Sequence, residues 1–79
     1  MKIKDLAINE SGFVFNPYTG ESFSVNSTGY EILKLLRKDL SQEEIVNELT
    51  GIFDISKDQA EKDVIDFLNM LEKYDLLEK

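Results

Sequence analysis

The chain has 79 residues, of which 42% are hydrophobic and 32% charged, and its net charge is −7 at pH 7. This size and balance predict one folded domain spanning residues 1–79, with a thin core and little interior for an enclosed active site. The sequence contains no cysteine and no histidine. Disulfides, thiolate nucleophiles, and the commonest general base and metal ligand are therefore excluded. We expect a binding module rather than an enzyme, with no catalytic residue, metal site or cofactor.

The acidic balance also limits the partners that the protein can bind. Affinity for nucleic acid comes largely from basic residues that neutralise phosphates, and this chain has 16 acidic residues against 9 basic ones. We therefore expect no nucleic-acid partner. The sequence has neither a signal-like amino terminus nor an apolar run of about 18 residues that would span a membrane. We expect a cytoplasmic protein without a membrane partner.

The first third of the sequence predicts three strands, at residues 2–8, 12–16 and 22–26, arranged as an antiparallel meander. The first segment has the weakest strand pattern, because its apolar residues lie among charges. In the third segment Phe23 and Val25 alternate with polar residues, which is typical of a half-buried strand.

A hairpin turn is predicted between the second and third segments, at Asn16-Pro17-Tyr18-Thr19-Gly20. Asn and Pro favour the opening of such a turn. Gly20 supplies the positive φ that the chain needs to enter the next strand.

The remaining two thirds predict three helices, at about residues 28–38, 41–50 and 56–74. Each begins with Ser or Thr followed three residues later by Glu or Gln, the pattern of a capping box, in the pairs Thr28 and Glu31, Ser41 and Glu44, and Ser56 and Gln59. Each helix also carries an apolar stripe at helical spacing. We expect these stripes to form the core, through Ile32, Leu33, Leu36, Ile45, Val46, Leu49, Ala60, Val64, Phe67, Leu68 and Leu71.

The ends of two helices are also predicted. Gly51 is expected to end the second helix in a left-handed conformation, with Ile52 folded back on Val46. Leu76 and Leu77 are expected to close the core after the third helix. The order of the elements predicts an α+β fold, in which a three-stranded antiparallel sheet is followed by three helices.

The third strand is expected to be an open edge of the sheet. Residues 22–26 contain no lysine or proline, the residues that usually protect an edge strand, so their main chain is available to an incoming strand. Alternatively, the third helix covers this edge. Ile65 lies off the core stripe of that helix, and beside an open edge it would form the floor of an apolar groove.

The order of these features resembles the PqqD family over nearly the whole chain, from Gly12 to Leu77. The amino-terminal half of the resemblance lies in Gly12-Phe13-Val14-Phe15, Pro17, Thr19-Gly20, Phe23-Ser24-Val25-Asn26, Thr28-Gly29 and Ile32-Leu33. The carboxyl-terminal half lies in Ser41, Glu44-Ile45, Phe53-Asp54-Ile55-Ser56, Ala60, Asp63-Val64, Phe67-Leu68 and Leu71.

The resemblance implies a winged-helix-like domain that recognises ribosomally synthesised precursor peptides. In that family the leader segment of the precursor adds as a strand to the third strand, against the third helix, and is presented to a modifying enzyme, often a radical SAM protein. Carried over by position, the peptide-binding residues are Ser22, Phe23, Ser24, Val25 and Asn26 on the strand, and Glu61, Lys62, Ile65, Leu68 and Asn69 on the helix. For Asn26 we favour a role as a cap at the start of the first helix.

Two other interpretations stay open. A winged-helix domain can instead serve as a protein-interaction or transcription-regulatory module, although the second and third predicted helices are both net acidic and so ill-suited to DNA. The open edge can also pair with the same edge of a second copy, which would give a homodimer.

Overall fold

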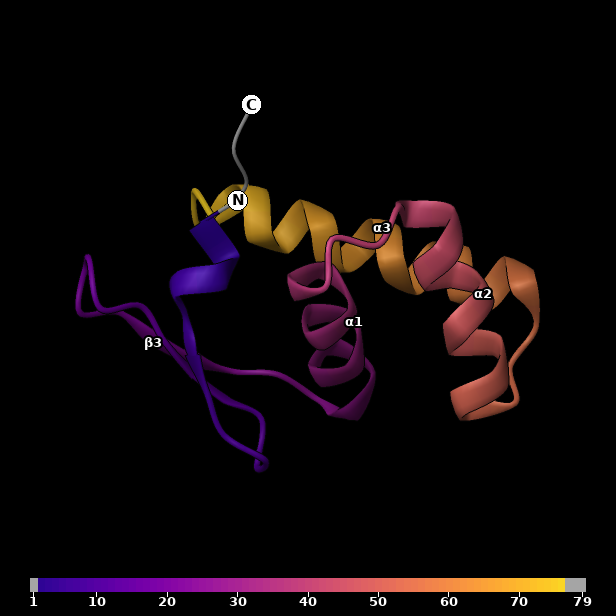
Figure 1. Ribbon diagram of the computed structural model, residues 1–79, viewed down its shortest axis with the longest axis horizontal. Coiled ribbons are helices and arrows are strands. Elements are labelled where there is room, and N and C mark those ends of the chain that lie inside the picture. Colours follow the sequence, from indigo (N-terminus) through magenta and orange to yellow (C-terminus); the bar gives the residue numbers. More distant parts are fainter. Residues whose placement is uncertain (1, 77–79) are drawn as a thin grey trace.

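The structure, a computed structural model, describes residues 2–76 and contains a small sheet followed by three helices (Figure 1). In chain order the elements are a 3-10 helix, η1 (Lys2–Asp5), strands β1 (Ala7–Ile8), β2 (Phe13–Phe15) and β3 (Ser22–Ser24), and helices α1 (Ser27–Arg37), α2 (Gln42–Phe53) and α3 (Lys57–Lys73). This order confirms the predicted α+β fold with a three-stranded antiparallel sheet.

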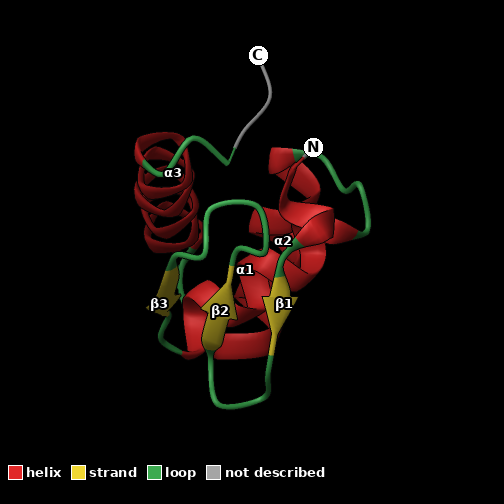
Figure 2. Ribbon diagram, turned by 90° about the vertical axis from the view of Figure 1, so that its left-hand side faces the viewer, coloured by secondary structure: helices red, strands yellow, loops and turns green. Residues whose placement is uncertain are grey.

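The sheet has the strand order β1-β2-β3, and both pairs of strands are antiparallel. Figure 2 shows the strands in front of the helices, so one face of the sheet packs on the helical layer. Val14 in the central strand is fully buried against that layer. Its neighbours Phe13 and Phe15 point to the opposite face, where they are 45% and 39% exposed, because successive side chains of a strand alternate between faces.

The amino-terminal segment differs from the expected strand. Residues 2–5 form a 3-10 helix, and the strand begins only at Ala7. Ile3 and Leu6 are both buried in the core. Their spacing of three residues suits a 3-10 turn, which places residues i and i+3 on the same side, whereas a strand would send them to opposite faces.

The hairpin between β2 and β3 has the predicted turn. Gly20 has a φ of 79°, and its amide donates to the carbonyl of Asn16 at 2.8 Å. The side chain of Asn16 accepts from the amide of Tyr18 at 2.9 Å.

Gly12 is also in the positive-φ region, at 85°, and a Cβ there would clash with the carbonyl oxygen of Val25.

The first helix begins one residue earlier than the sequence pattern predicted. Its N-cap is Asn26, whose side chain accepts from the amide of Gly29 at 2.8 Å. Thr28 therefore lies inside the first turn of α1, and the predicted capping box with Glu31 is wrong. The role expected for Asn26 as a helix cap is confirmed.

The other two helix starts were predicted correctly. In α2 the amide of Glu44 donates to the Ser41 hydroxyl at 3.2 Å, and the Glu44 carboxylate accepts from the Ser41 amide at 2.9 Å. In α3 the Ser56 hydroxyl accepts from the amide of Gln59 at 3.1 Å. The side chain of Gln59 does not complete a capping box, because it donates to Asp63 instead.

The second helix runs past its predicted end. Gly51 stays helical, and the helix continues to Phe53. The left-handed position belongs to Asp54, with a φ of 53°, and aspartate tolerates this conformation better than most residues. Ile52 is 48% exposed, so it does not fold back on the core as expected.

The core lies between the sheet and the three helices and contains the predicted helix stripes. Leu68 is the exception among them, since it is only partly buried against the core. Leu76 is buried as expected, and Leu77 lies outside the described residues. The buried apolar residues are Ile3, Leu6, Val14, Ile32, Leu33, Leu35, Leu36, Ile45, Val46, Leu49, Ala60, Val64, Phe67, Leu71 and Leu76.

Two glycine-to-alanine substitutions are expected to have opposite effects on stability. Gly51→Ala should stabilise the protein by up to about 1 kcal/mol, because Gly51 is helical and a methyl group there meets nothing within 4 Å. Gly12→Ala should destabilise it by about 1–3 kcal/mol, because of the positive φ and the clash with Val25. Urea unfolding of both variants measures the two changes. A stable Gly12→Ala variant would contradict this account of the β2–β3 contact.

The capping box of α2 is expected to make stability depend on pH. The hydrogen bond from the Ser41 amide, with a smaller contribution from the Ser41 hydroxyl, lowers the pKa of Glu44 below its usual value of 4.5. A carboxylate with a lowered pKa in the folded state adds stability above its unfolded pKa, and this contribution is lost as the pH falls below about 4.5. The stability difference between wild type and Glu44→Gln should therefore shrink between about pH 6 and about pH 3. Unfolding of both proteins across this range would show a constant difference if the capping box were absent.

Candidate functional site

Strand β3 is an edge of the sheet and pairs with β2 alone within residues 2–76. The amide of Val25 donates to the carbonyl of Gly12 at 2.8 Å, and the amide of Asn16 donates to the carbonyl of Glu21 at the same distance. Antiparallel pairs alternate between hydrogen-bonded and non-hydrogen-bonded, so the main chain of Phe23 also faces β2.

The same alternation turns the main-chain groups of Ser22 and Ser24 away from the sheet. Asn26, beyond the strand, has its carbonyl occupied by the amide of Tyr30 at 2.9 Å. The sequence predicted that the main chain of all residues 22–26 is available to an incoming strand. In the structure only the main-chain groups of Ser22 and Ser24 in this segment point outward.

The end of α3 approaches β3, and an earlier part of α3 approaches the start of α1. The ring of Phe23 stacks on Tyr74, just after the end of α3, with ring centroids 4.9 Å apart and planes at 11°. Further along the chain, Gly29 at the start of α1 lies against Phe67, which is about two helical turns before Tyr74. As the chain passes from β3 into α1, it contacts successively earlier residues of α3. Helix α3 lies on the side of the sheet where β3 lies (Figure 2).

A hollow of about 390 Å³ lies between the end of β3, the start of α1 and α3. Its floor is apolar and its rim is polar. Of its lining residues on α3, Met70 is the one nearest in sequence to Tyr74, whose ring stacks on Phe23, and Asp63 is the farthest from it. The lining residues are Ser24, Val25, Asn26, Thr28, Gly29, Ile32, Asp63, Asp66, Phe67 and Met70.

Gly29 sets how closely α1 and α3 approach each other. A Cβ at this position would lie 2.9 Å from Cε1 of Phe67 and 3.1 Å from Cβ of Val25. Real side chains almost never come so close, so the ring of Phe67 packs over the first turn of α1 because residue 29 has no side chain. This contact forms the base of the groove.

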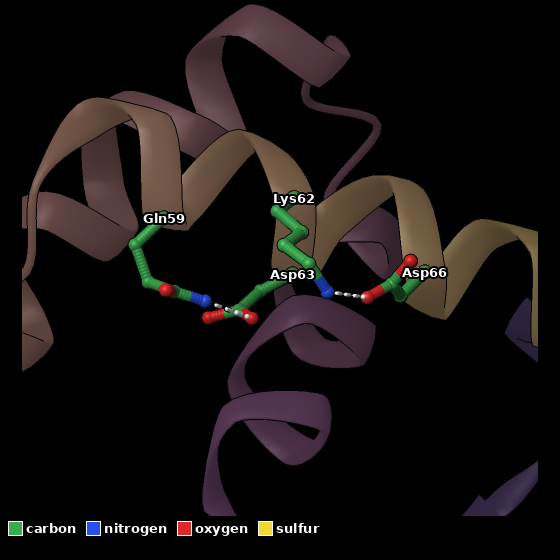
Figure 3. Close-up of polar contacts among 4 residues, drawn as sticks. All are labelled: Gln59, Lys62, Asp63 and Asp66. Carbon is green, nitrogen blue, oxygen red and sulfur yellow. Dashed lines mark hydrogen bonds and ion pairs between the residues drawn. The ribbon is translucent and has the colours of Figure 1, made fainter.

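The rim of the groove is acidic on the α3 side. Asp63 accepts from the side-chain amide of Gln59 at 2.8 Å, and Asp66 accepts from Lys62 at 3.0 Å (Figure 3). The hydrogen bond and charge attraction of Asp66, with a weaker attraction from Asp63, raise the pKa of Lys62. Both aspartates are thus held by neighbours on their own helix, one by a neutral amide and one by a cation.

The structure does not bring all the predicted site residues together. Glu61 and Ile65 line a second hollow, of about 360 Å³, between α2 and α3. Ile65 is 47% exposed there and does not line the groove beside β3. Lys62 and Asn69 are exposed, and Leu68 packs partly on the core. Glu61 and Ile65 therefore lie on the α2 side of α3, away from the predicted strand residues, whereas Lys62 contacts Asp66 at the rim of the groove beside β3.

The groove residues of α3 that sequence reasoning missed are Asp63, Asp66, Phe67 and Met70. Phe67 belongs to the core stripe itself, whereas Asp63, Asp66 and Met70 follow at helical spacing on the other flank of that stripe. Both flanks of an amphipathic helix border its apolar stripe equally. Choosing between them required knowing which neighbour packs on which flank.

Within residues 2–76, no cluster of three or more acidic side chains is arranged to bind a metal ion. The three helices of this part of the chain are all too short or too polar to cross a membrane.

Comparison with known proteins agrees with the fold. The family described as coenzyme PQQ synthesis protein D (PqqD) matches residues 12–77, so the chain belongs to the PqqD family. A solved structure described as TbiB1 in complex with the TbiA(beta) leader peptide is 28% identical in sequence, with a TM-score of 0.81. That match covers 92% of this chain and 86% of the other. No curated protein matched the sequence.

The contact at the base of the groove can be tested by Gly29→Ala. Overpacking against Phe67 and Val25 costs about 1–3 kcal/mol, and the better helix propensity of alanine offsets up to about 1 kcal/mol of it. We expect a net loss of about 1 kcal/mol in urea unfolding, with NMR shift changes at Val25 and Phe67. Gly51→Ala, the same change in an open position, should leave both signals in place. Unchanged shifts in Gly29→Ala would contradict the close contact.

Proposed function

We propose that this protein binds the leader segment of a ribosomally synthesised precursor peptide without catalysing a reaction on it. The peptide adds as a fourth strand to the edge of β3 and lies in the groove against α3. The protein then presents the peptide to a modifying enzyme, for which a radical SAM protein is the candidate that the family resemblance implies.

The observation that carries this proposal is the open edge of β3 next to a groove with an apolar floor. The outward main-chain groups of Ser22 and Ser24 can form the hydrogen bonds of an added strand, which give affinity without regard to sequence. The groove, floored by Val25, Phe67 and Met70, then receives peptide side chains and gives selectivity.

The comparisons support the same function. The TbiB1 structure is a complex with a leader peptide, and its match extends over most of both chains. Family membership over residues 12–77 covers the strand edge, the groove and α3 together. These are the parts of the chain that the proposed binding mode uses.

The charge of the helices makes the regulatory alternative less suitable. In a winged-helix DNA-binding protein a helix enters the major groove, where it meets phosphates. The first turn of α2 carries Glu43 and Glu44, and α2 has no basic residue in its last turn. A helix of this charge would be repelled by DNA.

Proline at position 24 should block peptide addition selectively. The amide of Ser24 points away from β2, so Ser24→Pro removes an outward donor and leaves the hydrogen bonds to β2 intact. We expect peptide binding to weaken roughly tenfold or more, since the hydrogen bonds and the close approach of the strand are both lost. The measurement is an NMR titration with a synthetic leader segment of a precursor encoded beside this gene.

Two matched variants locate the binding site. Ser24→Ala keeps the amide and should bind as wild type does, whereas Ile65→Asp changes the α2 side of α3 and should have little effect. Shift changes confined to the α2–α3 hollow, with binding lost in Ile65→Asp and retained in Ser24→Pro, would reject the β3 site. Light scattering of the free protein would show whether the same edge pairs two copies instead.

A further inference from the structure

We propose that the groove selects a peptide in which a Lys or Arg side chain stands two residues before a large apolar side chain. This inference rests on the proposed function, because it specifies the sequence that the added strand carries. It depends on three features of the structure, which are the alternation of the added strand, the gradient from apolar to acidic along the groove, and the direction of β3.

Alternation determines which peptide residues face the groove. Side chains directly opposite each other on paired strands point to the same face of a sheet. Phe23 and Val25 point toward α3 and the core, whereas Ser22 and Ser24 point to the outer face with Phe13 and Phe15. Peptide residues opposite Phe23 and Val25 therefore point into the groove, and these residues are two apart in the peptide.

The groove changes from apolar to acidic along its length. Its apolar residues on α3 are Phe67 and Met70, and Met70 lies one helical turn before Tyr74, whose ring stacks on Phe23 outside the groove lining. Asp66 and Asp63 follow toward the start of α1. On a helix with a rise of about 1.5 Å per residue, Asp66 lies about 6 Å and Asp63 about 10 Å from Met70 along the axis. Two residues of a strand span about 6.6 Å. When one peptide side chain lies over Met70, the next side chain that faces the groove therefore reaches the two aspartates.

The two aspartates are suited to a cationic side chain. Asp63 accepts a hydrogen bond from a neutral amide, and Lys62 pairs with Asp66 on an exposed surface. Two carboxylates with one cation leave a net negative rim above an apolar floor. The positive end of the α1 dipole lies near Thr28 and opposes a bound cation, but it amounts to about half a charge and is already capped by Asn26.

The direction of the added strand sets the order of the two residues. The strands β1, β2 and β3 are all antiparallel to their neighbours, and antiparallel pairing is slightly more stable per residue than parallel pairing. An antiparallel peptide enters at the Asp63 end and leaves toward the Phe23–Tyr74 stack. Its cationic residue therefore precedes its apolar residue in sequence.

Selection from a library of random peptides about 12 residues long, enough to span the edge strand, tests this inference without knowledge of the natural precursor. Peptides displayed on their encoding mRNA are selected on the wild-type protein and on Asp63→Asn/Asp66→Asn. We expect the wild type to enrich Lys or Arg two residues before an apolar residue. Peptides enriched on the double variant should retain the apolar residue but no longer carry the cationic one. The double variant should also bind a peptide selected on the wild type roughly three- to tenfold more weakly.

The matched control is Glu61→Gln, which removes one negative charge from the α2 side of the same helix. It should leave the enriched pattern unchanged. This control matters because the net charge of −7 alone would favour cations anywhere in the peptide, without a fixed distance from the apolar residue. Enrichment without that fixed distance overturns the inference, as does enrichment retained in the double variant.

The remaining outcomes separate this inference from the proposed function. Peptides that shift the NMR signals of β3 but lack the cation would overturn the selectivity and leave strand addition intact. The reverse order, with the apolar residue first, would overturn antiparallel addition. A double variant that is less stable but selects the same peptides would show that the aspartates only support α1. If no selected peptide shifts β3, the proposed function itself fails.

Discussion

The close approach of α1 and α3 at Gly29 is the constraint on which the site depends. Because residue 29 has no side chain, the ring of Phe67 rests on the first turn of α1 and against Val25. That contact fixes α3 alongside the edge of the sheet at a distance that leaves a groove. The same contact supplies the groove with its apolar floor, so the packing that holds the domain together also forms the surface available to a ligand.

The two edges of the sheet are protected to different degrees. On one side, β1 has two residues and follows one residue after a 3-10 helix whose Ile3 is in the core. Very short strands and adjoining structure are common ways to protect an edge from pairing. On the other side, β3 ends two residues before the cap of α1, and its serines turn their main chain outward. An incoming strand is therefore directed to β3.

Much of the fold could be predicted because it is specified locally. The left-handed glycine at position 20 and the reciprocal bonds of Ser41 with Glu44 each follow from residues within a few positions of one another. The errors arose where two local patterns competed. Asn26 capped α1 in place of Thr28, and Asp54 adopted the left-handed conformation expected of Gly51.

The sequence by itself determined the presence and order of three strands and three helices, the alternation of side chains along β3 and the acidic character of the protein. The tertiary structure alone decided which flank of α3 faces β3. Periodicity identifies the apolar stripe of a helix, but Ile65 on one flank and Asp63 on the other border that stripe equally. The choice between them is made by the packing of α2 on one side and of Gly29 and Val25 on the other, contacts between residues far apart in the chain.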